Sequence, residues 1–352
     1  MNKEYKEKVA LKNKLAKYYL GQAKKNGLSD TKLLKKYLPL ELRNRFLDRG
    51  IIIAHLDFER VADAIANHKP YAIVSGANPS SALHLGHKAV FDLVSEYAKY
   101  GGQVFIPLTN DESYVDGKVN SLEEGNKNAH EKIIPLLPRF GLEKSVVFTD
   151  SDYPEIYVMA MEIAGMLDCE AVRMAFGDKA VKNVGQMFYR GGVQIAQILL
   201  PQIPKYGGPK PTLVPVGIDQ HPYVLLARDI AKRMGLVPPS ELVIKLQSSL
   251  KDPEEKMSKS KQGTAIFLDD SKDVIKKKIN AAYTGSVSKL EDHRNLGGVP
   301  EIDAAFNLLL FHHPDDKLMA TIHADYRKGR LTGGDVKRIA TDFIVDCLIP
   351  SV

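Results

Sequence analysis

The sequence predicts an α/β protein with a parallel sheet, a helical insertion inside the sheet region and helical segments at both ends. Two strand–helix–strand patterns carry this prediction. In the first, an apolar run at residues 71–76 precedes a helical segment at 84–101 and a second apolar run at 102–109. In the second, residues 211–246 repeat the same order. Because parallel strands need a crossover connection, usually a helix, these patterns indicate a Rossmann-like sheet.

The N-terminal part is expected to be mainly helical. Apolar residues recur there at helical spacing. Asp30 or Ser29 is placed to cap one of the helices, and Pro39 marks its end. The elements expected in this part are helices at residues 11–20, 31–38 and 57–68 and a short strand at 51–53.

The rest of the chain divides into a sheet region and a second helical region. A mostly helical insertion, at about residues 121–190, separates the two strand–helix–strand patterns. The last part contains four segments of helical periodicity. The predicted units are therefore an N-terminal helical extension at 1–68, a Rossmann-type domain at 69–272 and a helical domain at 273–352.

Composition limits the class of protein. No apolar run approaches the roughly 20 residues that span a bilayer, and the N-terminus lacks the apolar core of a secretory signal. The two cysteines, Cys169 and Cys347, are too few for a disulfide framework or a four-ligand zinc site. We therefore expect a cytoplasmic protein without a bound structural metal. The net charge of +6 favours a polyanionic partner, although many unrelated proteins are equally basic.

The first functional motif lies where a predicted strand gives way to a helix, at residues 78–87 (NPSSALHLGH). The unpaired N–H groups and partial positive charge of a helix N-terminus attract phosphate. Gly86 lets a ligand approach the backbone, and His84 and His87 lie on one face of the first turn. We predict that both histidines donate hydrogen bonds to a phosphate chain. Alone, the motif would suit an ordinary exposed helix start somewhat better.

The second motif is KMSKS at residues 256–260, inside a polar segment too hydrophilic for the core. A loop with several lysines and hydroxyls can close over a triphosphate. The lysine charge would then stabilise the negative charge that moves onto leaving pyrophosphate. Alone, this motif would better suit a solvated, lysine-rich loop.

Together the two motifs resemble a known family. HLGH and KMSKS, about 170 residues apart and in this order, resemble the HIGH and KMSKS signatures of class I aminoacyl-tRNA synthetases. Residues 217–223 (GIDQHPY) resemble the IDQDPY segment of the archaeal and eukaryotic tryptophanyl enzymes. Residues 193–196 (VQIA) resemble their IQIAP strand, and residues 109–112 (TNDE) resemble their TDDE. Further matches extend from about residue 38 to residue 346.

The resemblance implies a role for each matching position. Asp219 would accept hydrogen bonds from the ATP ribose, and Gly217 would let the nucleotide lie close. Glu112, Gln194 and Gln220 would hold the ammonium and carboxylate of the amino acid. The positions that would contact phosphate and carry catalysis are His84, His87, Lys256 and Lys259. The other ATP-binding positions implied are Ser75, Gly76, Asn78, Gly86, Met257, Ser258 and Ser260.

Some positions depart from the tryptophanyl pattern. Val74 replaces a tyrosine and Pro107 replaces a glutamine, both of which contact the indole in the family. His221 replaces the aspartate of DQDP, and GANPSS replaces GRGPSS. One interpretation is a tryptophanyl enzyme with a rebuilt pocket. The other is a paralogue with altered or weakened amino-acid specificity, for tyrosine or another amino acid. A related adenylyltransferase and a regulatory protein are the further alternatives.

The resemblance also implies the reaction and the partners. Tryptophan would be activated by ATP, with Mg²⁺, to the aminoacyl-adenylate and then transferred to tRNA. The helical domain at 273–352 would bind tRNA and its anticodon, and two chains would form a homodimer through the insertion. The family's last helix commonly continues past the point where this chain stops, which would remove part of the anticodon surface.

Overall fold

The computed structural model describes residues 2–259 and 261–348. Within these residues seven strands form one sheet in the order β1-β2-β7-β6-β3-β4-β5. The strands are β1 (Ser29–Asp30), β2 (Ile52–Leu56), β3 (Ala72–Val74), β4 (Gln103–Leu108), β5 (Val146–Thr149), β6 (Thr212–Gly217) and β7 (Ser240–Ile244). The five strands from β7 to β5 are parallel, whereas β1 and β2 join the edge in antiparallel pairing.

Helices cover both faces of the sheet because each parallel strand buries both of its faces. Alternate residues of a strand point to opposite faces. On one face Ile73 and Leu213 pack into the same cluster as Phe91 of α5 (Leu85–Ala98). On the other face Val74 and Val214 pack with α8 (Glu155–Ala164), α11 (Gln194–Leu199) and α12 (His221–Arg233). The sheet is therefore the middle layer of three.

The strand order creates a crevice between β3 and β6. The chain leaves β3 toward β4 on one side, and it leaves β6 toward β7 on the other side. In open parallel sheets, ligands bind at the carboxyl ends of the strands where the order reverses in this way. HLGH follows β3, and GIDQ begins with the last residue of β6, so the fold brings both segments to this crevice.

The insertion between β4 and β6 is helical apart from one strand. The helix of its last part changes to a π-turn at Tyr189–Val193 and then continues as α11. Residues 193–196 were expected to form a strand, and that expectation is wrong: Val193 ends the π-turn and the rest belong to α11. A short apolar run that is buried on every side fits either element. The α-helices between β4 and α11 are α6 (Asn110–Val115), α7 (Leu122–Asn128), α8, α9 (Cys169–Phe176) and α10 (Val184–Phe188).

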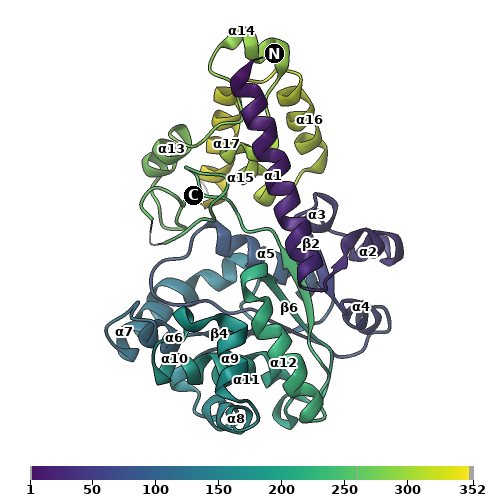
Figure 1. Cartoon of the computed structure of the whole chain (residues 1–352), viewed down its shortest axis with the longest axis vertical. Coiled ribbons are helices and arrows are strands. Elements are labelled where there is room, and N and C mark those ends of the chain that lie inside the picture. Colours follow the sequence, from purple (N-terminus) through teal and green to yellow (C-terminus); the bar gives the residue numbers. More distant parts are fainter. Residues whose placement is uncertain (1, 260, 349–352) are drawn as a thin grey trace.

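Figure 1 shows the long α1 running from the C-terminal helices to the sheet. Lysines of α1 contact the C-terminal region: Lys8 donates to the Thr284 carbonyl at 2.8 Å, and Lys12 pairs with Glu301 at 2.8 Å. Asp30 caps α2, as predicted, by accepting from Lys32 N–H. The N-terminal helices are α1 (Lys3–Lys25), α2 (Thr31–Tyr37), α3 (Arg45–Asp48) and α4 (Glu59–Ala66).

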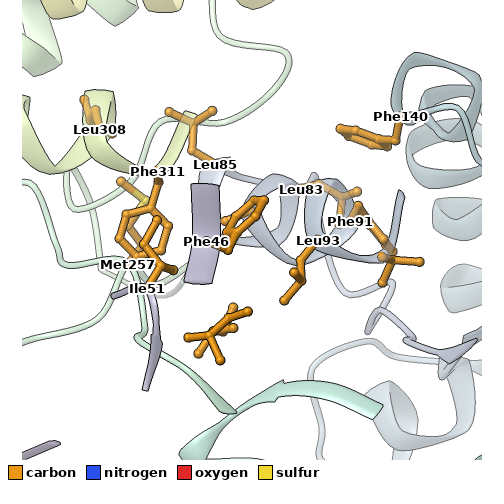
Figure 2. Packing of buried hydrophobic residues seen from close by; sticks show 14 of the residues in the cluster. Phe46, Ile51, Leu83, Leu85, Phe91, Leu93, Phe140, Met257, Leu308 and Phe311 are labelled. Atoms are coloured by element: carbon orange, nitrogen blue, oxygen red, sulfur yellow. The ribbon is translucent and has the colours of Figure 1, made fainter. Parts of the chain in front are cut away.

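The C-terminal helices pack on the side of the sheet domain that carries the KMSKS loop. Figure 2 shows Met257 of that loop near Phe311 of α15 and Ile51, which precedes β2; all three belong to one buried cluster. The helices are α13 (Lys272–Asn280), α14 (Leu290–Leu296), α15 (Ala304–His312), α16 (Asp316–Arg327) and α17 (Gly333–Leu348). Across the described residues, none of the helices has the length and apolar character needed to cross a bilayer.

Candidate active site

A cavity of about 700 Å³ lies at the crevice between β3 and β6. Both sequence motifs line it, so a single bound molecule can contact both. Of the ATP-binding positions expected from the sequence, Ser75 lies elsewhere and Ser260 is outside the described residues. The expected residues that line this cavity are Gly76, Asn78, His84, Gly86, His87, Gly217, Asp219, Gln220, Lys256, Met257, Ser258 and Lys259.

The two histidines at the start of α5 have fixed orientations. His84 Nδ1 accepts from the Gly86 N–H at 3.1 Å, and His87 Nδ1 accepts from the His84 N–H at 3.2 Å. This reciprocal pair is a capping box, which satisfies N–H groups at the helix start. Because both Nδ1 atoms accept, the proton of each neutral ring is on Nε2. Each ring therefore offers one N–H donor to the cavity.

The same histidines are neutral at ordinary pH. Burial, with the positive charges of Lys259 and Lys256, lowers the pKa of His84 to about 4. Burial and the neighbouring His84 also lower the pKa of His87 well below its usual value. The histidines therefore contribute directed N–H groups, and the positive charge of the cavity comes from the lysines.

The KMSKS loop reaches across to the loop that precedes α5. Lys259 Nζ donates to the Asn78 carbonyl at 3.0 Å and to the Ser81 carbonyl at 3.4 Å. Met257 anchors the loop, since its side chain is buried and its N–H donates to the Gln247 carbonyl at 2.9 Å. Burial, followed by the charge of Lys118, lowers the pKa of Lys259 to about 8. The two motifs are thus in direct contact.

Asp219 is positioned by the turn that follows β6. Its Oδ2 accepts from Lys256 Nζ at 2.6 Å, in a pair that is about half exposed. Exposed ion pairs of this kind contribute only about 0–1 kcal/mol, so a ribose hydroxyl can replace the lysine. A Cβ at Gly217 would lie 2.5 Å from Leu246 Cδ2 and 2.8 Å from Asp219 Oδ1, so a side chain there would displace both of these side chains.

A second cavity, of about 390 Å³, adjoins the first. It contains all five residues expected to hold the amino acid: Val74, Pro107, Glu112, Gln194 and Gln220. Gln194 Nε2 donates to Gln220 Oε1 at 3.2 Å, and Glu112 Oε2 accepts from Asn78 Nδ2 at 2.6 Å. Ser75 also lines this second cavity. Gly76, Asn78, His87, Gly217, Gln220 and Lys256 line both cavities.

Sequence patterns did not identify several residues that line these cavities. Lys118 borders both of them and lies 3.7 Å from Glu112. Tyr189, Gln197 and Tyr223 line the second cavity. Lys118 and Tyr189 lie outside any motif and carry no signal in a single sequence, whereas Tyr223 belongs to the GIDQHPY segment but was given no role there. Gln197 does carry a signal, because it is the polar residue in an otherwise apolar run, IAQILL.

The chemistry of the two cavities is complementary. The first offers imidazole N–H groups and lysine ammonium groups, which suit a polyphosphate. The second offers the Glu112 carboxylate and four amides, those of Asn78, Gln194, Gln197 and Gln220, beside apolar side chains, which suit an amino acid with a large side chain. Because the cavities share residues, an amino-acid carboxylate can lie next to the phosphates.

Comparison with known proteins agrees with this chemistry. The family model described as "tRNA synthetases class I (W and Y)" matches residues 66–348. The tryptophan–tRNA ligase of Methanocaldococcus jannaschii is 39% identical over 88% of this chain and 85% of its own. That of Pyrobaculum calidifontis is 33% identical over 88% and 83%. The crystal structure of tryptophanyl-tRNA synthetase from Aeropyrum pernix superposes with a TM-score of 0.85 at 29% identity, covering 94% of this chain and 91% of the other.

Proposed function

Because the chain belongs to the class I tRNA synthetases of the tryptophan and tyrosine family, we propose that it activates tryptophan with ATP and transfers it to tRNA. One observation carries the proposal: the HLGH and KMSKS segments line one cavity, and that cavity opens into a pocket with residues suited to an amino acid. The family match extends to residue 348, so it includes the helical region that a small adenylyltransferase would lack.

Activation needs no nucleophile from the protein. The tryptophan carboxylate attacks the α-phosphate of ATP, which forms the aminoacyl-adenylate and releases pyrophosphate. Glu112 and Gln194 would hold the ammonium group in the second cavity, and the residues shared by the two cavities would bring the carboxylate next to the phosphates. The Nε2–H groups of His84 and His87 and the ammonium groups of the KMSKS lysines stabilise the charge that develops on the phosphates.

Magnesium would enter this site with ATP, on the phosphate oxygens. The four residues expected to contact phosphate, His84, His87, Lys256 and Lys259, offer no oxygen ligand, and the oxygen groups of Asp219 and Ser258 in the same cavity are assigned to ATP itself. We therefore assign no protein ligand to the ion. Chelation of Mg²⁺ should stop adenylate formation.

In the second step a terminal ribose hydroxyl of tRNA attacks the aminoacyl carbonyl and displaces AMP. We assign tRNA binding to the helical region at residues 273–352, with the net charge of +6 favouring the polyanion. We place the reaction in the cytoplasm. Cys169 and Cys347 both lack a disulfide partner among the residues described, which suits a reducing compartment.

We also propose a homodimer formed through the insertion. Val158 and Met161 of α8 lie one turn apart and are 65% and 64% exposed. Met174 of α9 and Val184 of α10 are exposed even further. Large apolar side chains that face water in one segment indicate an interaction surface. A second copy is the occupant that we assign to it.

ATP–pyrophosphate exchange with each of the twenty amino acids tests the proposal. We expect tryptophan to support exchange and the other nineteen to support little. Charging of tRNA with radiolabelled tryptophan then tests the second step. Val74 and Pro107 favour one alternative, a synthetase with altered amino-acid specificity. Exchange with tyrosine or another amino acid in place of tryptophan would establish that alternative, and exchange with none would contradict both.

A further inference from the structure

The second cavity has an unusual composition for a pocket that receives an indole. Val74 at the end of β3 and Pro107 of β4 line it, and neither side chain can accept a hydrogen bond. An indole carries one N–H donor, and burying a donor without an acceptor weakens binding by about 10- to 100-fold. We propose that Gln197 accepts this hydrogen bond and thereby selects tryptophan, an assignment that rests on the function proposed above.

Gln197 occupies the right place because of the helix geometry. It lies three residues after Gln194 on α11, so both side chains are on one face, about 4.5 Å apart along the axis. Gln194 contacts Gln220 where the two cavities join. Gln197 is one turn further on, 3% exposed, and lines the same cavity as Val74 and Pro107. An amino acid held by its ammonium group near Gln194 can therefore extend its side chain toward Gln197.

The amide of Gln197 is held in one orientation. Its Nε2 donates to Asp150 Oδ2 at 2.6 Å, and both residues are buried. A glutamine amide has donors on nitrogen and an acceptor on oxygen. With Nε2 bonded to the carboxyl of Asp150, Oε1 is the group available to the cavity. A carbonyl oxygen can only accept, so this part of the pocket matches an N–H donor.

A chain of hydrogen bonds behind the pocket explains why the nitrogen faces Asp150. Tyr157 donates to Asp111 Oδ2 at 3.2 Å, and the carboxyls of Asp111 and Asp150 are close enough for each to shift the pKa of the other. Asp150 Oδ1 is buried and, among the described residues, has no hydrogen-bond partner. Burial, followed by the charge of Asp111, raises the pKa of Asp150 well above its usual value. A proton on Asp150 Oδ1 donates to Asp111, which leaves Oδ2 to accept from Gln197.

Two tyrosines are the competing partners. Tyr189 and Tyr223 also line the cavity, and both are buried. A phenol hydroxyl can rotate and can donate or accept. It would therefore tolerate both an N–H donor and an acceptor in the ligand. The fixed carbonyl of Gln197 would accept only from an N–H donor in the ligand. The experiment measures this selectivity.

The experiment compares tryptophan with benzothienylalanine, in which sulfur replaces the indole N–H group and the shape is nearly kept. We measure kcat/KM for each in ATP–pyrophosphate exchange with the wild type, Gln197→Leu and Gln197→Met. The wild type should prefer tryptophan by about 10- to 100-fold, and both variants should reduce this ratio to about 1. A ratio within one variant is independent of the fraction of folded enzyme.

Gln202→Leu is the matched control. Gln202 is buried nearby, but both ends of its amide bond to the backbone of Val237, at 2.8 Å each, and it does not line the cavity. This variant should lose stability and keep the wild-type ratio. Tyr189→Phe and Tyr223→Phe should also keep it.

Several results would overturn the assignment. These are a wild type that does not discriminate, Gln197 variants that keep the discrimination, and a tyrosine variant that loses it. Equal losses for both substrates in the Gln197 variants would show a structural role only. Absence of exchange with tryptophan in the wild type is a separate outcome, which contradicts the proposed function and the assignment with it.

Discussion

The orientation of His84 leads to a prediction in which stability and catalysis can be separated. Its ring has two functions at opposite atoms. Nδ1 caps α5 by accepting from the Gly86 N–H, and the protonated Nε2 faces the nucleotide cavity. His84→Ala removes both functions, whereas His84→Asn keeps a good helix cap and removes the donor, because asparagine is shorter and is among the preferred N-cap residues.

The expected magnitudes follow from these two functions. Loss of the cap in His84→Ala should lower the free energy of unfolding by about 0.5–2 kcal/mol, and His84→Asn should leave it nearly unchanged. Loss of a donor that stabilises transition-state charge costs about 10²–10³-fold in kcat. Both variants should therefore lose adenylate formation to a similar extent, although only one loses stability.

Pyrophosphate exchange gives kcat and the KM for ATP, and chemical denaturation gives the stability. His323→Asn serves as the control, because this histidine lies in α16 and its side chain is 41% exposed. Exchange at the wild-type rate in His84→Asn would refute the role of the donor. So would a loss confined to the KM for ATP, which indicates binding of the ground state and the transition state alike.

Further predictions concern the loop, the carboxyl pair and the dimer. Because the pKa of Lys259 is lowered to about 8, its charge is lost above that pH, and kcat/KM for ATP should fall as pH rises through about 8. The Lys259→Arg variant stays charged, so its kcat/KM should no longer fall in this range. A fall that is unchanged in the variant would contradict the assignment. The pKa of Asp150 is raised in the folded protein, so its contribution to stability is present below the pKa of the unfolded chain and is lost as pH rises. The melting temperature of Asp150→Asn minus that of the wild type should therefore increase from pH 5 to pH 8. A difference that stays constant would show that Asp150 does not retain a proton. In analytical ultracentrifugation the wild type should sediment as a dimer and the double variant Val158→Glu/Met161→Glu as a monomer. The control Leu290→Glu changes a similarly exposed apolar residue of α14 and should remain dimeric. A monomeric wild type would contradict the proposed interface.

Much of the fold and site followed from local patterns. The alternation of apolar runs and helical segments predicted the β3–α5–β4 and β6–α12–β7 units. The resemblance of HLGH and KMSKS to the family's two signatures predicted a shared phosphate site, and the structure places both segments on one cavity. Such patterns can be recognised in a single sequence because a helix start or a flexible loop is formed by residues that are neighbours in the chain.

Other features depended on contacts between distant residues. The strand β5 was not expected, since four residues at a sheet edge gain their hydrogen bonds only by pairing with β4. Residues 193–196 were expected to form a strand by resemblance to the family's IQIAP segment, and so short a run shows no helical period that would have indicated α11 instead. The pairing of β2 with β7 likewise joins segments nearly two hundred residues apart.

The sequence by itself determined which chemical groups this protein brings to its substrates: two imidazoles at a helix start, a lysine-bearing loop and a set of amides and carboxylates. Local contacts at the start of α5 fix the protons of His84 and His87 on Nε2, since their partners lie two and three residues away. The tertiary structure alone decided which groups meet in one site and how the amide of Gln197 is turned, because its partner is Asp150. The physical reason is that a hydrogen-bonding group acquires a direction only from its partner, and the partner of Gln197 lies 47 residues away in the chain.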